Sequence, residues 1–321
     1  MELTVAFLGT GGTVPSALRS TASVLITRGG LKMMFDCGEG TQRQLRLSTG
    51  LVQVDEVYLS HLHLDHCLGL PGLLKTYDLN DRSEALRIYG PIGTGRFLEV
   101  ITGITGRIGY PVEVVELEPG EAITGDGFAV ESFQVEHRTR ALGYALVEED
   151  RPGRMDPEEA ARLGVRSGPE LGALQRGETV EGDSGPVTPE QVMGEAREGR
   201  RVVITGDTAP CQATVMAAAD ADLLVHDASF TAEDGERARE TAHSTATDAA
   251  EIAREAQVRL LALVHISARY HVKEVLREAR EIFPEAVAPR DFDLVEIPFR
   301  ERGQPRLVEG GAIRGQDESG G

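Results

Sequence analysis

Four side chains that commonly bind metal ions lie within six consecutive residues, His61-Leu62-His63-Leu64-Asp65-His66. The segment follows an apolar run at residues 54–59 that is typical of a short strand. Side chains alternate between the faces of an extended segment, so His61 and His63 are expected to point the same way. Asp65 and His66 fall where the chain turns into the next helix. Three of only eight histidines lie here, which favours two adjacent metal ions over a polar loop.

Four further residues that can bind metal or transfer a proton each come just after an apolar strand candidate. They are His137 after 128–135, Asp207 after 202–206, Asp227 after 223–226 and His265 after 260–264. Ligands and catalytic groups collect at strand ends in α/β sheets. Each residue alone is as easily a buried structural group, but together with the hexapeptide they indicate one functional site.

Strand candidates alternate with helical segments along the chain, which predicts an α/β architecture. One helix is expected at 68–77 and another at 245–256, with Ser244 as its N-cap. Residues 151–199 break this pattern because they are rich in Gly, Pro and charge. We expect a catalytic domain over residues 1–308 that carries 151–199 as a projecting insertion, and a disordered tail at 309–321.

Composition limits the possible partners and compartments. The 321 residues contain no apolar run long enough to span a bilayer, and three cysteines fit a reducing cytoplasm better than a disulfide framework. The first residues, Met1-Glu2-Leu3-Thr4-Val5, read as a strand and not as a signal peptide. A formal net charge of −19 argues against nucleic acid as a partner unless arginines gather locally.

Several further stretches are distinctive when taken together with the hexapeptide. They are Gly38-Glu39-Gly40-Thr41-Gln42-Arg43-Gln44, Leu70-Pro71-Gly72-Leu73-Leu74, His243-Ser244-Thr245 and His265-Ile266-Ser267-Ala268-Arg269-Tyr270. The hexapeptide alone resembles only the metallo-β-lactamase superfamily, whereas the combination resembles its tRNA 3′-processing endonucleases, the ribonuclease Z family. The resemblance runs from about residue 1 to 298. It implies a four-layer αβ/βα fold, in which the insertion at 151–199 is a flexible arm, or exosite, that grips tRNA.

The resemblance also implies a role for each site residue. His61, His63 and His137 would hold one zinc ion, Asp65, His66 and His265 a second, and Asp207 would bridge both. Asp65 would also orient or deprotonate the attacking water. His243 would protonate or hold the leaving oxygen, with Asp227 as its acidic neighbour where family members often carry a glutamate.

RNA contacts are expected from arginines. The family often has P-x-K-x-R-N near the N-terminus, whereas this chain has Pro15-Ser16-Ala17-Leu18-Arg19-Ser20, so the cut position relative to a CCA end stays open. The expected contacts are Arg19 and Arg269, together with the arm residues Arg151, Arg154, Arg162, Arg166 and Arg176.

These observations lead to one expected function and two alternatives. We expect a cytoplasmic homodimer with two Zn²⁺ per subunit that removes the 3′ trailer from precursor tRNA and leaves a 3′-hydroxyl and a 5′-phosphate. The first alternative is another hydrolase of the superfamily that acts on small phosphodiesters, esters or sulfates. The second is a non-catalytic RNA-binding protein, against which the complete ligand set argues.

Overall fold

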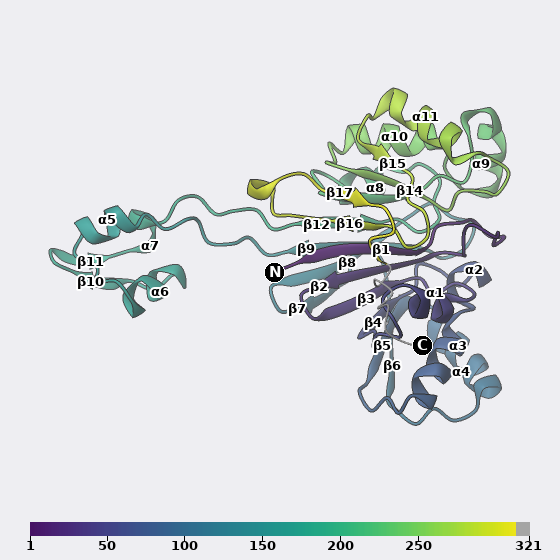
Figure 1. Cartoon of the computed structure of the whole chain (residues 1–321), viewed down its shortest axis with the longest axis horizontal. Helices are drawn as coiled ribbons and strands as arrows, with labels where there is room; N and C mark the ends of the chain where they lie inside the picture. The colour runs from purple at the N-terminus through teal and green to yellow at the C-terminus, as the bar shows by residue number, and fades with distance from the viewer. Residues whose placement is uncertain (313–321) are drawn as a thin grey trace, which may run out of the picture. The chain divides into compact units, whose positions relative to one another are not determined.

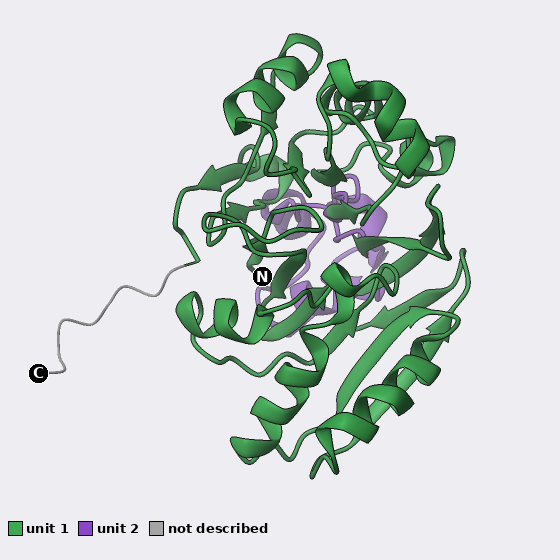
Figure 2. Ribbon diagram, turned by 90° about the vertical axis from the view of Figure 1, so that its right-hand side faces the viewer, with its two compact units in different colours: residues 1–147, 201–321 green, residues 148–200 purple. Residues whose placement is uncertain are grey.

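The structure is a computed structural model of the chain and describes residues 1–312. The chain forms two compact units, Met1–Val147 with the segment from Arg201 onward, and Glu148–Arg200 (Figure 2). The first unit contains two β-sheets and carries every residue of the hexapeptide. No helix among residues 1–312 is both long and apolar enough to cross a membrane.

The first sheet has eight strands in the order β17-β16-β1-β2-β3-β4-β5-β6. Their bounds are β1 Leu3–Gly9, β2 Ser23–Arg28, β3 Leu31–Phe35, β4 Glu56–Tyr58, β5 Leu86–Pro91, β6 Val112–Leu117, β16 Leu294–Glu296 and β17 Arg306–Val308. Strands β3 to β6 pair in parallel, which brings their carboxyl ends to one edge of the sheet. The hexapeptide follows β4 at that edge.

The second sheet has seven strands in the order β15-β14-β13-β12-β9-β8-β7. Their bounds are β7 Ala122–Gly125, β8 Phe128–Gln134, β9 Leu142–Glu148, β12 Arg201–Ile204, β13 Leu223–Asp227, β14 Leu261–Val264 and β15 Ala286–Val287. Strands β12 to β15 are parallel, so the residues that follow β12, β13 and β14 also meet at one edge.

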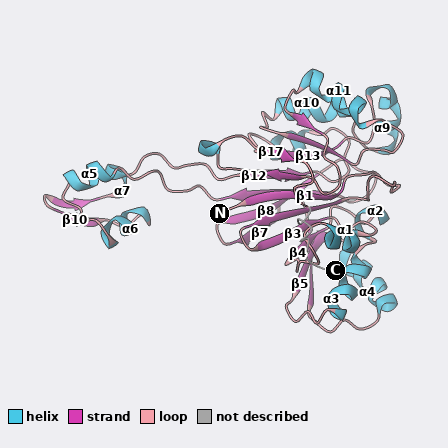
Figure 3. Ribbon diagram, in the orientation of Figure 1, coloured by secondary structure: helices cyan, strands magenta, loops and turns pink. Residues whose placement is uncertain are grey.

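Helices cover the outer faces of both sheets, which gives the four layers that the family resemblance implies (Figures 1 and 3). The helices beside the first sheet are α1 Thr41–Leu47, α2 Leu64–Cys67, α3 Leu70–Leu79 and α4 Thr94–Thr105. Those beside the second are α8 Gln212–Ala217, α9 Gly235–Thr241, α10 Ala246–Glu255 and α11 Val272–Ile282, with 3₁₀ turns at Ala232–Asp234 and Arg300–Arg302.

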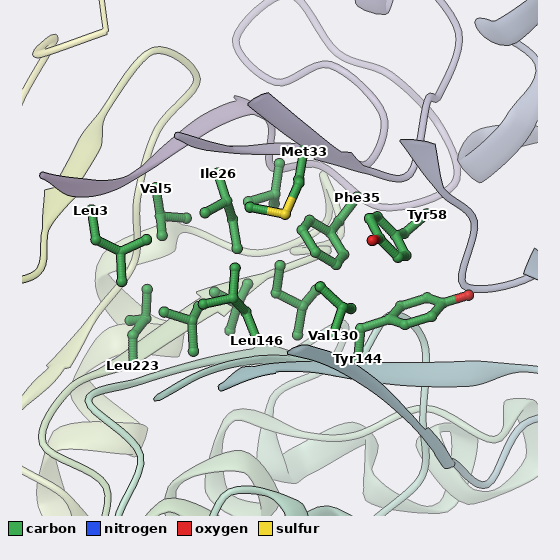
Figure 4. Packing of buried hydrophobic residues seen from close by; sticks show 14 of the residues in the cluster. Leu3, Val5, Ile26, Met33, Phe35, Tyr58, Val130, Tyr144, Leu146 and Leu223 are labelled. Atoms are coloured by element: carbon green, nitrogen blue, oxygen red, sulfur yellow. The ribbon is translucent and has the colours of Figure 1, made fainter. Parts of the chain in front are cut away.

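Three apolar clusters hold these layers together. The central cluster lies between the sheets, where Ile26 and Phe35 of the first sheet face Val130 and Leu146 of the second (Figure 4). A second cluster joins the first sheet to α1, α3 and α4, and a third, rich in alanine, joins the second sheet to α8, α10 and α11. Full burial of a large aliphatic side chain stabilises a fold by about 1.5–3 kcal/mol, so these clusters fix the strand ends firmly.

The observed elements differ from the sequence expectation in a few places. The helix expected at 68–77 begins instead at Leu70, as α3, and the separate short helix α2 precedes it. At Gly69, between the two, a Cβ would come within 2.0 Å of the Gly38 carbonyl oxygen. Ser244 is not the cap of α10. Thr245 is the N-cap instead, in a capping box with Asp248. The short elements β7, β17 and α9 had no clear periodicity and were not expected.

The second unit, Glu148–Arg200, covers the expected insertion within a few residues. It contains α5 Pro157–Arg162, α6 Pro169–Gln175, α7 Pro189–Val192 and the hairpin of β10 Val180–Gly182 with β11 Gly185–Val187. Ala160, Val165, Leu174, Val187 and Val192 form a small core of its own. At its base, the buried guanidinium of Arg200 donates to both carboxylate oxygens of Glu148, at 2.7 and 2.8 Å. The insertion is therefore a folded element and not a structureless loop.

The expected tail is described only in part. Residues 309–312 follow β17, the Ala312 N–H donates to the Phe292 carbonyl oxygen at 2.9 Å, and the Ala312 side chain is buried. The packed fold thus extends to residue 312, and residues 313–321 lie outside the described part of the chain.

Candidate functional site

The structure brings the seven residues expected to bind metal into two adjoining groups that share Asp207. One group contains His61, His63 and His137, and the other contains Asp65, His66 and His265. They lie in loops, or in the short helix α2, that follow strands of both sheets, so the site lies where the carboxyl edges of the sheets meet. Within each group, one nitrogen or oxygen atom per residue lies within 4.8 Å of the others.

The first group is built around the Nδ1 atom of His63. His61 Nε2 lies 2.9 Å from it and His137 Nε2 lies 3.3 Å from it. Asp207 Oδ2 lies 3.8 Å from His61 Nε2. Burial, followed by the neighbouring His66, lowers the pKa of His61 well below its ordinary value. His61 is therefore neutral, which is the protonation state that binds metal.

The second group is more deeply buried. His265 Nε2 lies 3.2 Å from Asp65 Oδ2 and 3.4 Å from Asp207 Oδ1, and His66 Nε2 lies 3.2 Å from the same Asp207 oxygen. Among the described residues, His66 Nε2 and Asp207 Oδ1 are buried and have no hydrogen-bond partner. Buried polar atoms without partners are rare, and here they face one another among further ligand atoms. This arrangement fits a metal ion.

Asp207 faces both groups with different oxygens, Oδ2 toward His61 and Oδ1 toward His66 and His265. Burial by itself raises the pKa of Asp207, but His265 and His66 outweigh it and hold the pKa well below its usual range. The carboxylate is therefore ionised and can bridge two cations.

The Nδ1 atoms of four histidines have fixed partners outside the two groups. His66 Nδ1 lies 2.7 Å from Asp36 Oδ2 and His61 Nδ1 lies 3.0 Å from Ser60 Oγ. His137 Nδ1 lies 3.0 Å from the Ala242 carbonyl oxygen, and His265 Nδ1 lies 2.8 Å from Ser229 Oγ. Metal-binding histidines are usually oriented in this way through their second nitrogen. The four Nε2 atoms are thus directed into the site.

Three residues at the site have left-handed backbone although none is glycine, namely Asp36 (φ 58°), Ala242 (φ 56°) and His265 (φ 59°). This conformation costs a residue with a Cβ about 1 kcal/mol or more, and such strain often gathers at functional sites. At Ala242 it ends α9 and turns the carbonyl toward His137. Arg138, which directly follows His137 in the chain, donates to the carbonyl oxygen of Glu240 in α9. The end of α9 thus holds the His137 segment.

His243 and Asp227 form a pair beside the second group. His243 Nδ1 lies 2.7 Å from Asp227 Oδ2, and the His243 ring stacks on His265. Burial lowers the pKa of His243, but the Asp227 carboxylate outweighs this and raises the pKa to about 9. Ser229 Oγ donates to the other Asp227 oxygen at 2.6 Å, which fixes the carboxylate. The pair is suited to hold a proton at neutral pH.

Sequence similarity to known proteins assigns the chain to a family. A sequence profile described as the Metallo-beta-lactamase superfamily matches residues 17–270. A ribonuclease Z from Haloferax volcanii is 50% identical over 308 residues, which cover 94% of this chain and 97% of that protein. A ribonuclease Z from Methanosarcina acetivorans is 45% identical over 302 residues, which cover 93% and 99%. The chain belongs to the ribonuclease Z family.

A solved structure agrees with this assignment. Human tRNase Z, short form, is 27% identical, has a TM-score of 0.68, and the match covers 92% of this chain and 99% of that chain. The resemblance to ribonuclease Z and the metallo-β-lactamase fold are therefore confirmed. The chain is an enzyme of a hydrolase family, and its histidine and aspartate groups imply a metal ion.

The arginines expected to bind RNA occupy different environments, and Arg19 departs from the expectation. It is 9% exposed, and its Nη1 donates to Thr10 Oγ1 at 2.5 Å and to the Pro289 carbonyl oxygen at 2.8 Å. Burial lowers the pKa of Arg19, against the effect of nearby Asp291. Its guanidinium braces the loop after β1 and is turned away from solvent, which favours a structural role over an RNA contact.

The other candidates are accessible to different degrees. Arg269 is exposed in a cavity beside His243. In the second unit, Arg162 pairs with Glu159 at 2.5 Å and Arg176 with Glu178 at 2.7 Å, while Arg151 is half-buried. The remaining two, Arg154 and Arg166, are exposed, and no carboxylate of the described residues forms an ion pair with either. Those two side chains are thus the most available cations of this unit.

The sequence reasoning did not assign Asp36, Ser60, Ser229 or Ala242 to the site, nor Arg237, which lines the cavity beside His243. Asp36 directly follows β3, so the strand-end pattern that pointed to Asp207 applies to it as well. Ser60 and Ser229 are small hydroxyl residues next to ligands and give no distinctive sequence pattern. Ala242 acts through its carbonyl group, and Arg237 lies on α9, a helix that the sequence did not predict.

Proposed function

We propose that this enzyme is a zinc-dependent endoribonuclease that cuts precursor tRNA at its 3′ trailer, leaving a 3′-hydroxyl on the tRNA and a 5′-phosphate on the trailer. The observation that carries the proposal is the position of Asp207, whose two carboxylate oxygens face two separate histidine groups. Two cations side by side suit the in-line hydrolysis of a phosphodiester. The family relatives named ribonuclease Z supply the substrate class.

Two zinc ions fit the ligand atoms better than one. A tetrahedral zinc with metal–ligand distances of about 2.1 Å separates its ligand atoms by about 3.4 Å. Neighbouring ligand atoms lie 2.9–3.8 Å apart in the first group and 3.2–3.6 Å apart in the second. Most of the ligand atoms are imidazole nitrogens, which suit zinc, whereas magnesium prefers a shell made of oxygen atoms.

The protein's own groups perform the remaining chemistry. Zinc in this site would lower the pKa of a water molecule and stabilise charge on the phosphate. Asp65 Oδ2, 3.2 Å from His265 Nε2, would orient the attacking water. His243, with Nδ1 held by Asp227, would donate a proton from Nε2 to the leaving 3′ oxygen. No covalent intermediate with the protein is needed.

We propose that the unit at Glu148–Arg200 is a tRNA-binding arm on a catalytic domain formed by the rest of residues 1–308. Its acidic residues outnumber its arginines, so contact with RNA depends on a few exposed cations, chiefly Arg154 and Arg166. We further propose that the enzyme acts as a cytoplasmic homodimer, in which the arm of one subunit holds tRNA that is cut in the other. Light scattering of the purified protein at working concentration tests the dimer.

The primary experiment incubates the zinc-loaded protein with a precursor tRNA that carries a trailer, and maps the new 3′ end. We expect one cut, a 3′-hydroxyl on the tRNA, and no cut with Asp65→Ala. Failure of the wild-type protein to cut at any metal or salt concentration would refute the proposal. Fewer than one bound metal per chain would favour the RNA-binding alternative.

Deletion of residues 151–199 distinguishes the proposed tRNA-processing function from the alternative that the protein hydrolyses small phosphodiesters. The deletion removes the core of the arm together with its charges, and leaves the two metal groups untouched. We expect loss of tRNA cleavage with retention of bis(p-nitrophenyl) phosphate hydrolysis. Undiminished tRNA cleavage by this variant would contradict the proposed arm.

A further inference from the structure

A cavity of about 310 Å³ adjoins the metal groups. The proposed mechanism gives this cavity no role, although His243 and His265 form part of its wall. His243 and His265 form the part of its wall nearest the metal groups, Val14 and Phe230 form an apolar part, and Arg237 and Arg269 bring two guanidinium groups. A volume near 300 Å³ is at the small end of ligand sites and suits one nucleotide. The lining combines an apolar surface for a base or sugar with cations for a phosphate.

In the described part of the chain, the two arginines that line the cavity have no carboxylate partners of their own. Both are exposed, and within residues 1–312 no carboxylate forms an ion pair with either. By contrast, Arg96 pairs with Glu99 and Arg277 pairs with Glu281 on exposed helix faces. In a protein of net charge −19, two cations in one cavity without carboxylate partners are available to an anionic ligand.

The segments that carry the arginines are tied together. The Tyr270 hydroxyl, next to Arg269, donates to a carboxylate oxygen of Asp234, three residues before Arg237. The Ala232 N–H, in the same turn, donates to Glu278 of α11 at 2.9 Å. The separation of the two backbone segments is thus restricted before any ligand arrives, so that only the arginine side chains have to be ordered when one phosphate binds both.

We propose that Arg237 and Arg269 together bind the RNA phosphate immediately 5′ of the cleaved phosphate. The nucleotide that lies between these two phosphates would then pack against the apolar wall at Phe230. This inference rests on the proposed function, because it takes the substrate to be RNA. The side of the cut follows from His243: it lies in the same wall and protonates the leaving 3′ oxygen, which belongs to the last nucleotide of the tRNA body. The subsite therefore holds that nucleotide.

The test compares Arg237→Ala and Arg269→Ala with Arg239→Ala, an exposed arginine on the same helix that does not line the cavity. We expect kcat/KM for precursor tRNA to fall about 10–100-fold in the first two variants and to stay within about twofold in the third. Hydrolysis of bis(p-nitrophenyl) phosphate, which has only one phosphate, should stay the same in all three.

A modified RNA locates the contact. Replacing the phosphate 5′ of the last tRNA nucleotide by a neutral methylphosphonate should slow the wild-type enzyme by a similar factor and have little further effect on Arg237→Ala. The proposal is overturned if wild-type protein cuts precursor tRNA and Arg237→Ala cuts it as well as Arg239→Ala does, or if the modification slows both enzymes equally. If the wild-type protein does not cut precursor tRNA, the proposed function itself fails.

Discussion

The Oδ2 atom of Asp36 lies 2.7 Å from the Nδ1 atom of His66, so a carboxylate outside both metal groups orients a histidine of the second group. The same carboxylate accepts hydrogen bonds from the N–H and hydroxyl of Ser60 at 2.7 and 2.8 Å, and the Ser60 hydroxyl lies 3.0 Å from Nδ1 of His61. One buried acid thus influences histidines of both groups.

Asp36→Asn should weaken metal binding about 10–100-fold, because the amide cannot accept the same bonds from His66 and Ser60 together. Competition with a chromophoric chelator measures the affinity. Asp81→Asn is a matched control, since Asp81 also has left-handed backbone (φ 56°) but belongs to no metal group. Equal metal affinity of the two variants would show that Asp36 does not support the site.

Ala242→Val should disturb His137 and His243 together, because a β-branched side chain is strained in left-handed backbone by about 1–3 kcal/mol. We expect weaker metal binding and slower hydrolysis of a small phosphodiester. Ala242→Gly relieves the strain and should keep both properties near the wild-type level. Normal metal affinity in the valine variant would mean that the Ala242 carbonyl does not position His137.

In the metal-free protein, NMR titration of His243 should give a pKa of about 9, above its ordinary value of 6.5. The folded state therefore binds this proton more tightly than the unfolded state. The resulting stability is fully present below about pH 6.5 and is lost as the pH rises through 9, with an upper limit of about 3 kcal/mol. Asp227→Asn should lower the pKa of His243, because burial is then opposed chiefly by Asp207. An unchanged titration in that variant would rule out Asp227 as the cause.

Arg19→Ala should lower the free energy of unfolding by about 1–3 kcal/mol, because Thr10 and Pro289 lose a buried donor. Urea denaturation measures this loss. Arg19→Lys keeps the charge but not the guanidinium geometry and should recover little of it. If the substitution instead raises the KM for precursor tRNA and leaves stability unchanged, Arg19 contacts RNA as the sequence first suggested.

Removal of metal by a chelator should abolish hydrolysis and lower the thermal midpoint, since the buried ligand atoms then lose their shared partner. Zinc at about one hundred times its dissociation constant should restore about 2.7 kcal/mol of stability. Asp207→Ala should show no such rise, because both groups lose a ligand. A zinc-induced rise in that variant equal to the wild-type rise would place the metal elsewhere.

Much of the site was predictable because strand ends are recognisable in the sequence. His137, Asp207 and His265 each follow an apolar run, and parallel strands bring such positions to one edge. Asp36 has the same context, yet its contacts depend on a left-handed backbone that composition does not reveal. The carbonyl of Ala242 could not be predicted at all, because any residue offers the same group.

The burial of Arg19 could not be predicted from its neighbours in the sequence. Nothing near it in the sequence indicates burial, since its partner carbonyl belongs to Pro289, 270 positions away. The same holds for the helix α9, which has seven residues and too short a pattern to recognise. Its importance comes from the tertiary contacts of its C-terminal turn, and these appear only when both sheets are in place.

The separation of the ligands along the chain has a consequence for refolding. His61 precedes β5, whereas His265 follows β14, and the last strands of the first sheet, β16 and β17, come later still. The ligand set therefore cannot assemble from any single local segment, and loop closure on this scale is slow relative to helix formation. In a refolding experiment, zinc binding should lag behind the recovery of secondary structure. The time course of zinc binding would therefore report when the two sheets dock against each other.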